Sequence, residues 1–200
     1  MDETLIRRAL EARDLRGAAT ATIKQYGPEV LGLLTSLHRD PDEAEDAFSL
    51  FAERLWTSLE RYEAKCSMRT WAYVIARRAS HDVRRNAQRR GKGAVRISDT
   101  DVLEQLVAKV RTETMTILRT ETKTELAKLR EELPPEDQLL LVLRLDRQLA
   151  WNELAQVFLE GDAAPEEATL KTESARLRKR FQLVKERLLV LGRERGLIER

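Results

Sequence analysis

The chain has few of the residues that mark several protein classes. Its single cysteine, Cys66, excludes an internal disulfide framework and a zinc site built from several cysteines. Eight glycines, five prolines and only three Trp, three Tyr and four Phe are few for a β-sandwich or barrel. No apolar run approaches the roughly 18 residues of a membrane span, and no basic and apolar leader is present, so we expect a cytoplasmic protein with no membrane contact.

Recognisable catalytic patterns are also missing. The two histidines, His38 and His81, have no Cys or carboxylate cluster at metal-ligand spacing, and there is no nucleophile elbow, phosphate loop or dinucleotide fingerprint. We therefore expect no enzyme activity, no cofactor and no metal. The apolar share of 42% still supports a packed core, and the composition favours an all-α fold.

The net charge of +2 hides strong segregation of acids and bases. Residues 40–53 hold six acids and no base, whereas residues 69–96 hold nine bases and one acid. Residues 171–187 hold seven bases and two acids. Two basic stretches about a hundred residues apart suggest two separate contacts with a polyanion, although such runs also occur as plain solvated helix faces.

Capping and breaking residues divide the chain into helices. We expect helices over 2–16, 28–37 after a break at Gly27-Pro28, 41–61 after the Asp40-Pro41 start, and 68–90 after the Ser67 cap. Residues 62–67 form a short loop. A partly helical linker over 91–124 is followed by helices at 136–147, 150–160 and about 165–195, with Pro134-Pro135 cutting the chain before them.

The acidic helix has one clear core stripe. At 100° per residue this stripe consists of Ala44, Phe48, Phe51, Leu55 and Leu59. The opposite side carries Asp46, Leu50, Glu53 and Thr57, flanked by Ser49 and Arg54. A leucine among acids is either an ordinary exposed apolar residue or the centre of a partner surface with a charged rim.

The basic helix over 68–90 is expected to bury Met68, Trp71, Ala72, Ile75, Ala79 and Val83. Its outer side would then carry Arg69, Tyr73, Arg77, Ser80 and Arg84. Arginines beside an exposed aromatic ring are typical of a surface for single-stranded nucleic acid. A partly buried packing role for Tyr73 remains an equal alternative.

The C-terminal segment has the layout of a helix-turn-helix. A helix with Trp151, Leu154, Ala155 and Phe158 inward precedes a basic helix whose core stripe is Leu177, Phe181, Val184, Leu188 and Leu191. The residues available to a DNA groove are Lys171, Thr172, Arg176, Lys179 and Arg180.

Several segments in this order resemble a known family. Residues 42–46 (DEAED), 54–56 (RLW), 67–78 (SMRTWAYVIARR) and 82–85 (DVRR) are similar to region 2 of extracytoplasmic-function sigma factors, the two-domain branch of the sigma-70 family. Residues 133–136 (LPPE), 153–155 (ELA), 176–177 (RL) and Lys179 resemble region 4. The resemblance implies sigma region 2 over 1–90, a linker over 91–124 and sigma region 4 over 125–200.

The resemblance also implies a function and its site residues. The chain would be a non-enzymatic subunit that binds core RNA polymerase, through the clamp coiled coil and the β flap, and promoter DNA. The clamp would contact Asp46, Ser49, Leu50, Glu53 and Arg54. Bases of the −10 element would be captured near Tyr62, Lys65, Ser67, Arg69, Tyr73, Arg77 and Arg84. The −35 element would be read by Lys171, Thr172, Ser174, Arg176, Lys179 and Arg180. An anti-sigma protein is left open as a further partner.

Two departures from the family and two other functions are considered. Residues 49–52 (SLFA) replace the family's usual Gln-acid-x-Phe run of the clamp-binding helix, and residues 160–170 lengthen the turn before the recognition helix. A helix-turn-helix regulator that works without polymerase, or a helical adaptor with solvated arginines, would show the same composition. Cys66 in the loop is either a redox handle or an inert thiol.

Overall fold

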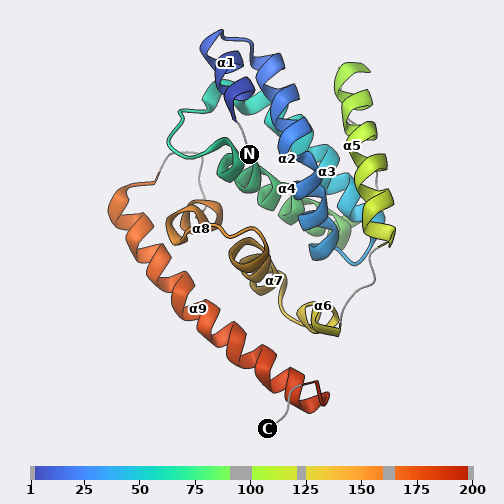
Figure 1. Ribbon diagram of the computed structural model, residues 1–200, viewed down its shortest axis with the longest axis vertical. Coiled ribbons are helices and arrows are strands. Elements are labelled where there is room, and N and C mark those ends of the chain that lie inside the picture. The colour runs from blue at the N-terminus through green and yellow to red at the C-terminus, as the bar shows by residue number, and fades with distance from the viewer. Residues whose placement is uncertain (1–2, 91–100, 121–124, 160–164, 198–200) are drawn as a thin grey trace. The chain divides into compact units, whose positions relative to one another are not determined.

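The computed structural model describes residues 3–90, 101–120, 125–159 and 165–197, and within these ranges it contains helices and no strand. The all-α prediction is confirmed. The chain divides into two compact units, residues 1–120 and 121–200. Figure 1 shows the helices of both units in chain order.

The first unit is built from five α-helices and one short 3-10 turn. Their bounds are α1 Thr4–Glu11, α2 Leu15–Leu37, α3 Pro41–Ser58, η1 Leu59–Arg61, α4 Met68–Arg90 and α5 Asp101–Thr120. The second unit contains α6 Glu125–Arg130, α7 Pro135–Leu141, the π-helical turn η2 Val142–Asp146, α8 Trp151–Phe158 and α9 Glu167–Glu194.

The start of α3 and the core stripe of that helix agree with the sequence. The side chain of Asp40 accepts a hydrogen bond from the backbone N of Asp42 at 3.0 Å, and Pro41 occupies the first turn, where its missing N–H costs nothing. All five residues of the predicted stripe are buried: Ala44, Phe48, Phe51, Leu55 and Leu59.

The predicted break at Gly27-Pro28 is wrong, because α2 runs without interruption from Leu15 to Leu37 with Pro28 inside it. Tyr26 and Gly27 before the proline and Val30 after it are buried, whereas Pro28 itself is exposed. The proline removes one backbone hydrogen bond from the helix. The buried apolar residues on both sides of it stabilise α2 as one continuous helix. The first helix also ends earlier than expected, because Arg13 takes a φ of 56° and Asp14 starts α2 by accepting from Gly17 N at 2.8 Å.

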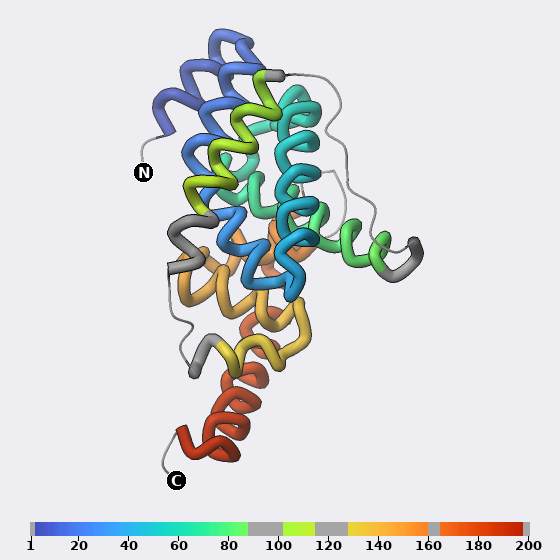
Figure 2. The backbone as a smooth tube through the Cα atoms, turned by 90° about the vertical axis from the view of Figure 1, so that its right-hand side faces the viewer, coloured from blue at the N-terminus to red at the C-terminus, as the bar shows by residue number. Residues whose placement is uncertain are grey.

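Helix α5 packs on the first unit. Part of the segment expected to be a linker forms this helix, and it contacts α2 and α3 (Figure 2). Its buried residues include Leu103, Val107 and Val110. Arg111 forms an ion pair with Glu45 of α3. The helix therefore adds an apolar layer and one charge contact to the bundle.

Gly27 lies where α2 packs closely against α5. A Cβ placed on Gly27 would lie 3.1 Å from Cγ1 of Val110 and 3.4 Å from Cζ of Phe48. The absence of a side chain at this position therefore lets α5 pack directly on α2.

We predict that Gly27→Leu destabilises the protein, because its extra carbons have no room between α2, α3 and α5. Overpacking of this kind costs about 1–3 kcal/mol. Urea unfolding followed by circular dichroism measures the change. Adding Val110→Ala to the Gly27→Leu variant is expected to restore part of the lost stability. An unchanged unfolding midpoint for Gly27→Leu would contradict the packing described for α5.

Candidate nucleic-acid and polymerase interfaces

The predicted outer face of α4 is wrong. Tyr73, Ser80 and Arg77 are buried, with exposed fractions of 1%, 1% and 7%. Helix α4 packs against both α2 and α3, so it buries more than the single stripe that the periodicity indicated. The prediction assumed one packing partner, and the fold supplies two.

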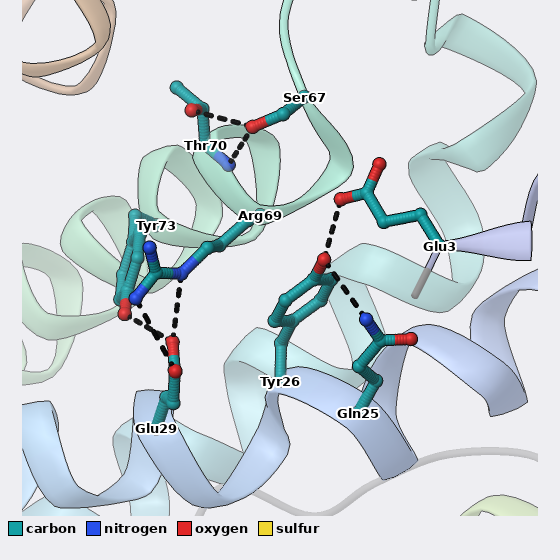
Figure 3. Close-up of polar contacts among 8 residues, drawn as sticks. All are labelled: Glu3, Gln25, Tyr26, Glu29, Ser67, Arg69, Thr70 and Tyr73. Carbon is teal, nitrogen blue, oxygen red and sulfur yellow. Dashed lines mark hydrogen bonds and ion pairs between the residues drawn. The ribbon is translucent and has the colours of Figure 1, made fainter. Parts of the chain in front are cut away.

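Arg69 and Tyr73 are bound to a carboxylate of α2 (Figure 3). Arg69 donates from Nε to Oε2 of Glu29 at 3.0 Å and from Nη2 to Oε1 at 3.3 Å. The hydroxyl of Tyr73 donates to the same Oε2 at 2.7 Å, and the Arg69 guanidinium lies 5.7 Å from the Tyr73 ring centroid. Burial acts to lower the pKa of Arg69, but the contacts with Glu29 and Tyr73 outweigh it and raise the pKa.

Arg84 also has a structural role. Its Nη2 donates to the carbonyl oxygen of Leu37 at 2.5 Å and so satisfies a backbone acceptor at the C-terminal end of α2. The arginines of α4 that were expected to meet DNA phosphates therefore hold α4 on α2. Their side chains are thus partly used in contacts within the protein.

The loop over 62–67 is closed by its own tyrosine. The Tyr62 hydroxyl donates to the Cys66 carbonyl oxygen at 2.6 Å, and the Tyr62 ring lies 5.8 Å from the Trp71 ring at an angle of 52°. Burial, with smaller contributions from Cys66 and Glu3, raises the pKa of Tyr62 to about 12, so the phenol keeps its proton. Ala64 takes a φ of 55°, which makes the turn at the loop's tip.

The predicted Ser67 cap is confirmed (Figure 3). The backbone N of Thr70 donates to Ser67 Oγ at 3.1 Å, which fixes the first turn of α4 next to the loop. Lys65 points to solvent and pairs only with exposed Glu63, at 2.5 Å. Surface pairs of this kind contribute little, so Lys65 remains available to a phosphate.

Trp71 was expected in the core unless it lay at the start of its helix, and it is half-buried in the first turn of α4, against Tyr62. Its indole Nε1 has no hydrogen-bond partner within the described part of the chain. In the sequence, the position of Trp71 one helical turn after the capping Ser67 indicates that its side chain lies beside the loop. The site therefore consists of an ordered loop, a lysine and a partly exposed indole.

The predicted polymerase face of α3 is narrower than the sequence indicated. Asp46, Leu50 and Glu53 are half-buried and lie on the outward side, whereas Ser49 is buried with 4% exposed. Arg54 points to α4, where its Nη2 contacts Oδ2 of Asp82 at 2.6 Å. Since α3 packs against α2, α4 and α5, only a narrow strip around Leu50 remains outward.

His38 is a buried link between three helices. Its side chain is fully buried after the end of α2, with Nδ1 3.2 Å from Glu43 Oε2 and Nε2 2.8 Å from Ser80 Oγ. Burial is the largest effect and lowers the pKa of His38 below its ordinary 6.5. The charge of Arg84 lowers this pKa further, while the hydrogen bond with Glu43 opposes the shift.

We predict that stability falls as the pH drops below about 6.5, because the unfolded chain then takes up a proton that folded His38 resists. The stabilising effect of the lowered pKa is present above 6.5 and is lost as the pH falls from there. Urea unfolding at pH 7.5 and 5.5 should give a smaller pH dependence for His38→Gln than for the wild type. His81→Gln serves as the control, and an equal effect of both substitutions would contradict the assignment to His38.

The segment predicted to be a helix-turn-helix forms α8 and α9, which pack against each other. Ser174, which was predicted to contact DNA, is buried with 2% exposed. Its Oγ contacts the Trp151 carbonyl oxygen at 3.1 Å and Asn152 Oδ1 at 3.0 Å. Ser174 thus fixes α9 on α8. This role could not be predicted from the sequence of α9 alone, because it depends on the neighbouring helix.

Most of the other residues predicted to contact DNA lie exposed at the start of α9. Lys171, Thr172, Arg176 and Lys179 are exposed, while Arg180 is half-buried and binds Asp137 at 2.6 Å. Arg176 forms two hydrogen bonds with Glu173, at 2.7 and 2.5 Å, and these contacts raise its pKa. Helix α9 begins at Glu167, and residues 160–164 of the long turn lie outside the described residues.

No group of three His, Cys, Asp or Glu residues suited to a metal ion occurs within the described ranges. None of the helices described is long and apolar enough to cross a membrane.

Part of this helical unit is similar to a known protein family. Residues 22–90, which comprise most of α2, the whole of α3 and η1, the loop and α4, match the family model of Sigma-70 region 2. No significant match was found among curated proteins or among solved structures. The chain therefore carries a sigma-70 region 2 domain.

This similarity covers about a third of the chain. The match ends at Arg90, so α5 and the second unit lie outside it.

Proposed function

We propose that this chain is a two-domain sigma factor of the extracytoplasmic-function type, acting with the polymerase in the bacterial cytoplasm. The first unit would bind the polymerase clamp and capture −10 bases, and the second unit would read the −35 element and meet the β flap. The observation that carries the proposal is the ordered loop beside a partly exposed indole within the matched region 2 domain.

Capture of a base at this loop follows from its chemistry. The Trp71 ring offers an apolar face at the mouth of α4, and Lys65 offers a cation to the adjacent phosphate. Closure by Tyr62 and the Ser67 cap hold this loop in one conformation before DNA binds. The cost of unstacking a base, a few kcal/mol, would be offset by stacking and phosphate contacts.

In this proposal, the α4 residues that the sequence predicted to contact DNA have a supporting role. Since Arg69, Tyr73 and Arg84 bind groups on α2, they would support the loop and not touch the bases. The Tyr62 ring would line one side of the same site. Charge reversal of Arg77 and Arg84 is therefore an unsuitable test, because it would disturb the packing of α4.

We predict that Trp71→Leu reduces open-complex formation, because leucine fills similar space but has no ring face for a base. Loss of about 1–3 kcal/mol of stacking corresponds to a fall of about 5- to 150-fold. Permanganate reactivity of unpaired thymines, with purified core polymerase, measures open complexes. Trp71→Phe keeps a ring and should lose less. Normal open complexes with a folded Trp71→Leu protein would contradict base capture at this site.

The strip around Leu50 on α3 is proposed as the contact with the polymerase clamp. It has an apolar centre with Asp46 and Glu53 beside it, which is the pattern of a protein interface with a charged rim. Ser49 would act only through packing, and Arg54 through its ion pair with Asp82.

We predict that Leu50→Asp weakens binding to core polymerase by at least about tenfold, since a charge would replace the apolar centre of the contact. Biolayer interferometry with immobilised core polymerase measures the affinity. Val102→Asp is the matched control, because Val102 is an apolar residue of the same unit with 60% of its surface exposed. Equal affinities for Leu50→Asp and the wild type would exclude this strip.

Reading of the −35 element is proposed for the exposed start of α9. Lys171, Thr172, Arg176 and Lys179 offer donors to base edges and phosphates in a major groove. Ser174 and Arg180 would fix the helix against α8 and α7.

Run-off transcription from a promoter library tests the proposal as a whole. Core polymerase should initiate at defined sites only when this chain is added. Absence of any chain-dependent start would reject the sigma function, and DNA binding as a dimer on a palindrome without polymerase would favour a classical regulator.

A further inference from the structure

Four arginines surround the turn between α1 and α2, and we call them the corner arginines: Arg7, Arg8, Arg13 and Arg16. All four are exposed. Within the described part of the chain, none of the four side chains has an ion pair or a side-chain hydrogen bond. They differ in this from Arg54, Arg69 and Arg84, whose side chains bind groups of the protein itself.

The carboxylates near the corner form no ion pair with its arginines within the described residues. Glu3 accepts a hydrogen bond from the Tyr26 hydroxyl at 2.5 Å, and Asp14 accepts one from the backbone of Gly17 at 2.8 Å. Glu11 is the one other acid between residues 3 and 16. Residues 3–16 hold four arginines and three acids, so one positive charge is in excess, and the four guanidinium groups remain without an ion pair within the described residues.

The corner has a defined shape. Ile6 is buried and packs α1 on α2, so Arg7 and Arg8 are held on the outer side of a short helix. Arg13 takes a φ of 56°, which reverses the chain between the two helices and brings Arg16 into the first turn of α2. The four side chains thus project from one folded element.

We propose that the corner arginines bind the phosphate backbone of DNA without reading its sequence. Guanidinium groups fit phosphates with paired hydrogen bonds, and each contact gains by releasing counterions. Residues 4–21 contain no aromatic ring that would stack on a base. An anionic membrane is a poorer partner, because the one large apolar residue exposed on α1 is Leu5, while Ile6 is buried.

The location of this contact along a promoter rests on the proposed function, whereas the affinity for phosphates does not. The N-terminal end of α1, opposite the corner, is bound to α2 through Glu3 and Tyr26. The corner and the loop belong to the same unit. The corner arginines would hold the duplex backbone while the loop takes a base.

Fluorescence anisotropy with the full-length chain and a labelled duplex of random sequence tests this inference. The affinity is measured between 50 and 200 mM KCl, without polymerase. The test variant combines Arg7→Gln, Arg8→Gln and Arg16→Gln and leaves Arg13, whose backbone conformation is unusual, in place. We expect the slope of log K against log salt to fall by about 2–3, because each lost phosphate contact on duplex DNA removes about 0.9.

The matched control combines Lys24→Gln, Arg39→Gln and Arg61→Gln, which removes the same charge from three other exposed positions of the same unit. The control should keep the wild-type slope. An equal fall in both variants would mean that net charge alone matters and would overturn the proposal. An unchanged slope in the test variant would also overturn it.

Two further measurements separate the proposal from its alternatives. If the test variant keeps its DNA slope but loses binding to core polymerase, or to vesicles of anionic phospholipid, the corner serves that partner and the proposal fails. If the wild-type chain gives no promoter-specific transcription but the anisotropy result holds, the sigma function fails and the DNA contact stands.

Discussion

The first unit depends on one carboxylate that joins two helices. Glu29 of α2 accepts hydrogen bonds from both Arg69 and Tyr73 of α4, 40 and 44 residues further along the chain. Hydrogen bonds to charged groups stabilise by about 1.5–3 kcal/mol each. Since α4 begins directly after the loop over 62–67, its attachment to α2 also determines where Tyr62, Lys65 and Trp71 lie.

This arrangement separates two uses of arginine in one protein. The arginines of α4 act inward: Arg69 binds Glu29 and Arg84 binds the end of α2. The arginines at the start of the chain have no such partners among the described residues, so their charges are available to an external anion. A count of charges along the chain does not distinguish the two sets, because a paired and an unpaired arginine contribute equally to it.

Helix α5 changes how the acidic helix is presented. It packs on α2 through the space left by Gly27 and binds α3 through Arg111 and Glu45. The outward part of α3 is thereby limited to the strip around Leu50, between α4 on one side and α5 on the other. The surface proposed for the polymerase is thus bounded by a helix that the sequence had assigned to a linker.

The sequence by itself determined the features that arise within a few residues. The caps at Asp40 and Ser67 and the buried stripe of α3 were predicted correctly, because each depends on local hydrogen bonds or on one apolar period. The loop beside Trp71 was also located. Only the tertiary structure decided which side of α4 faces outward, that Pro28 lies inside a continuous helix, and that Ser174 and Ser49 are buried. Those outcomes depend on how many neighbours each helix has, and helical periodicity reports one buried stripe without saying how many helices pack around it.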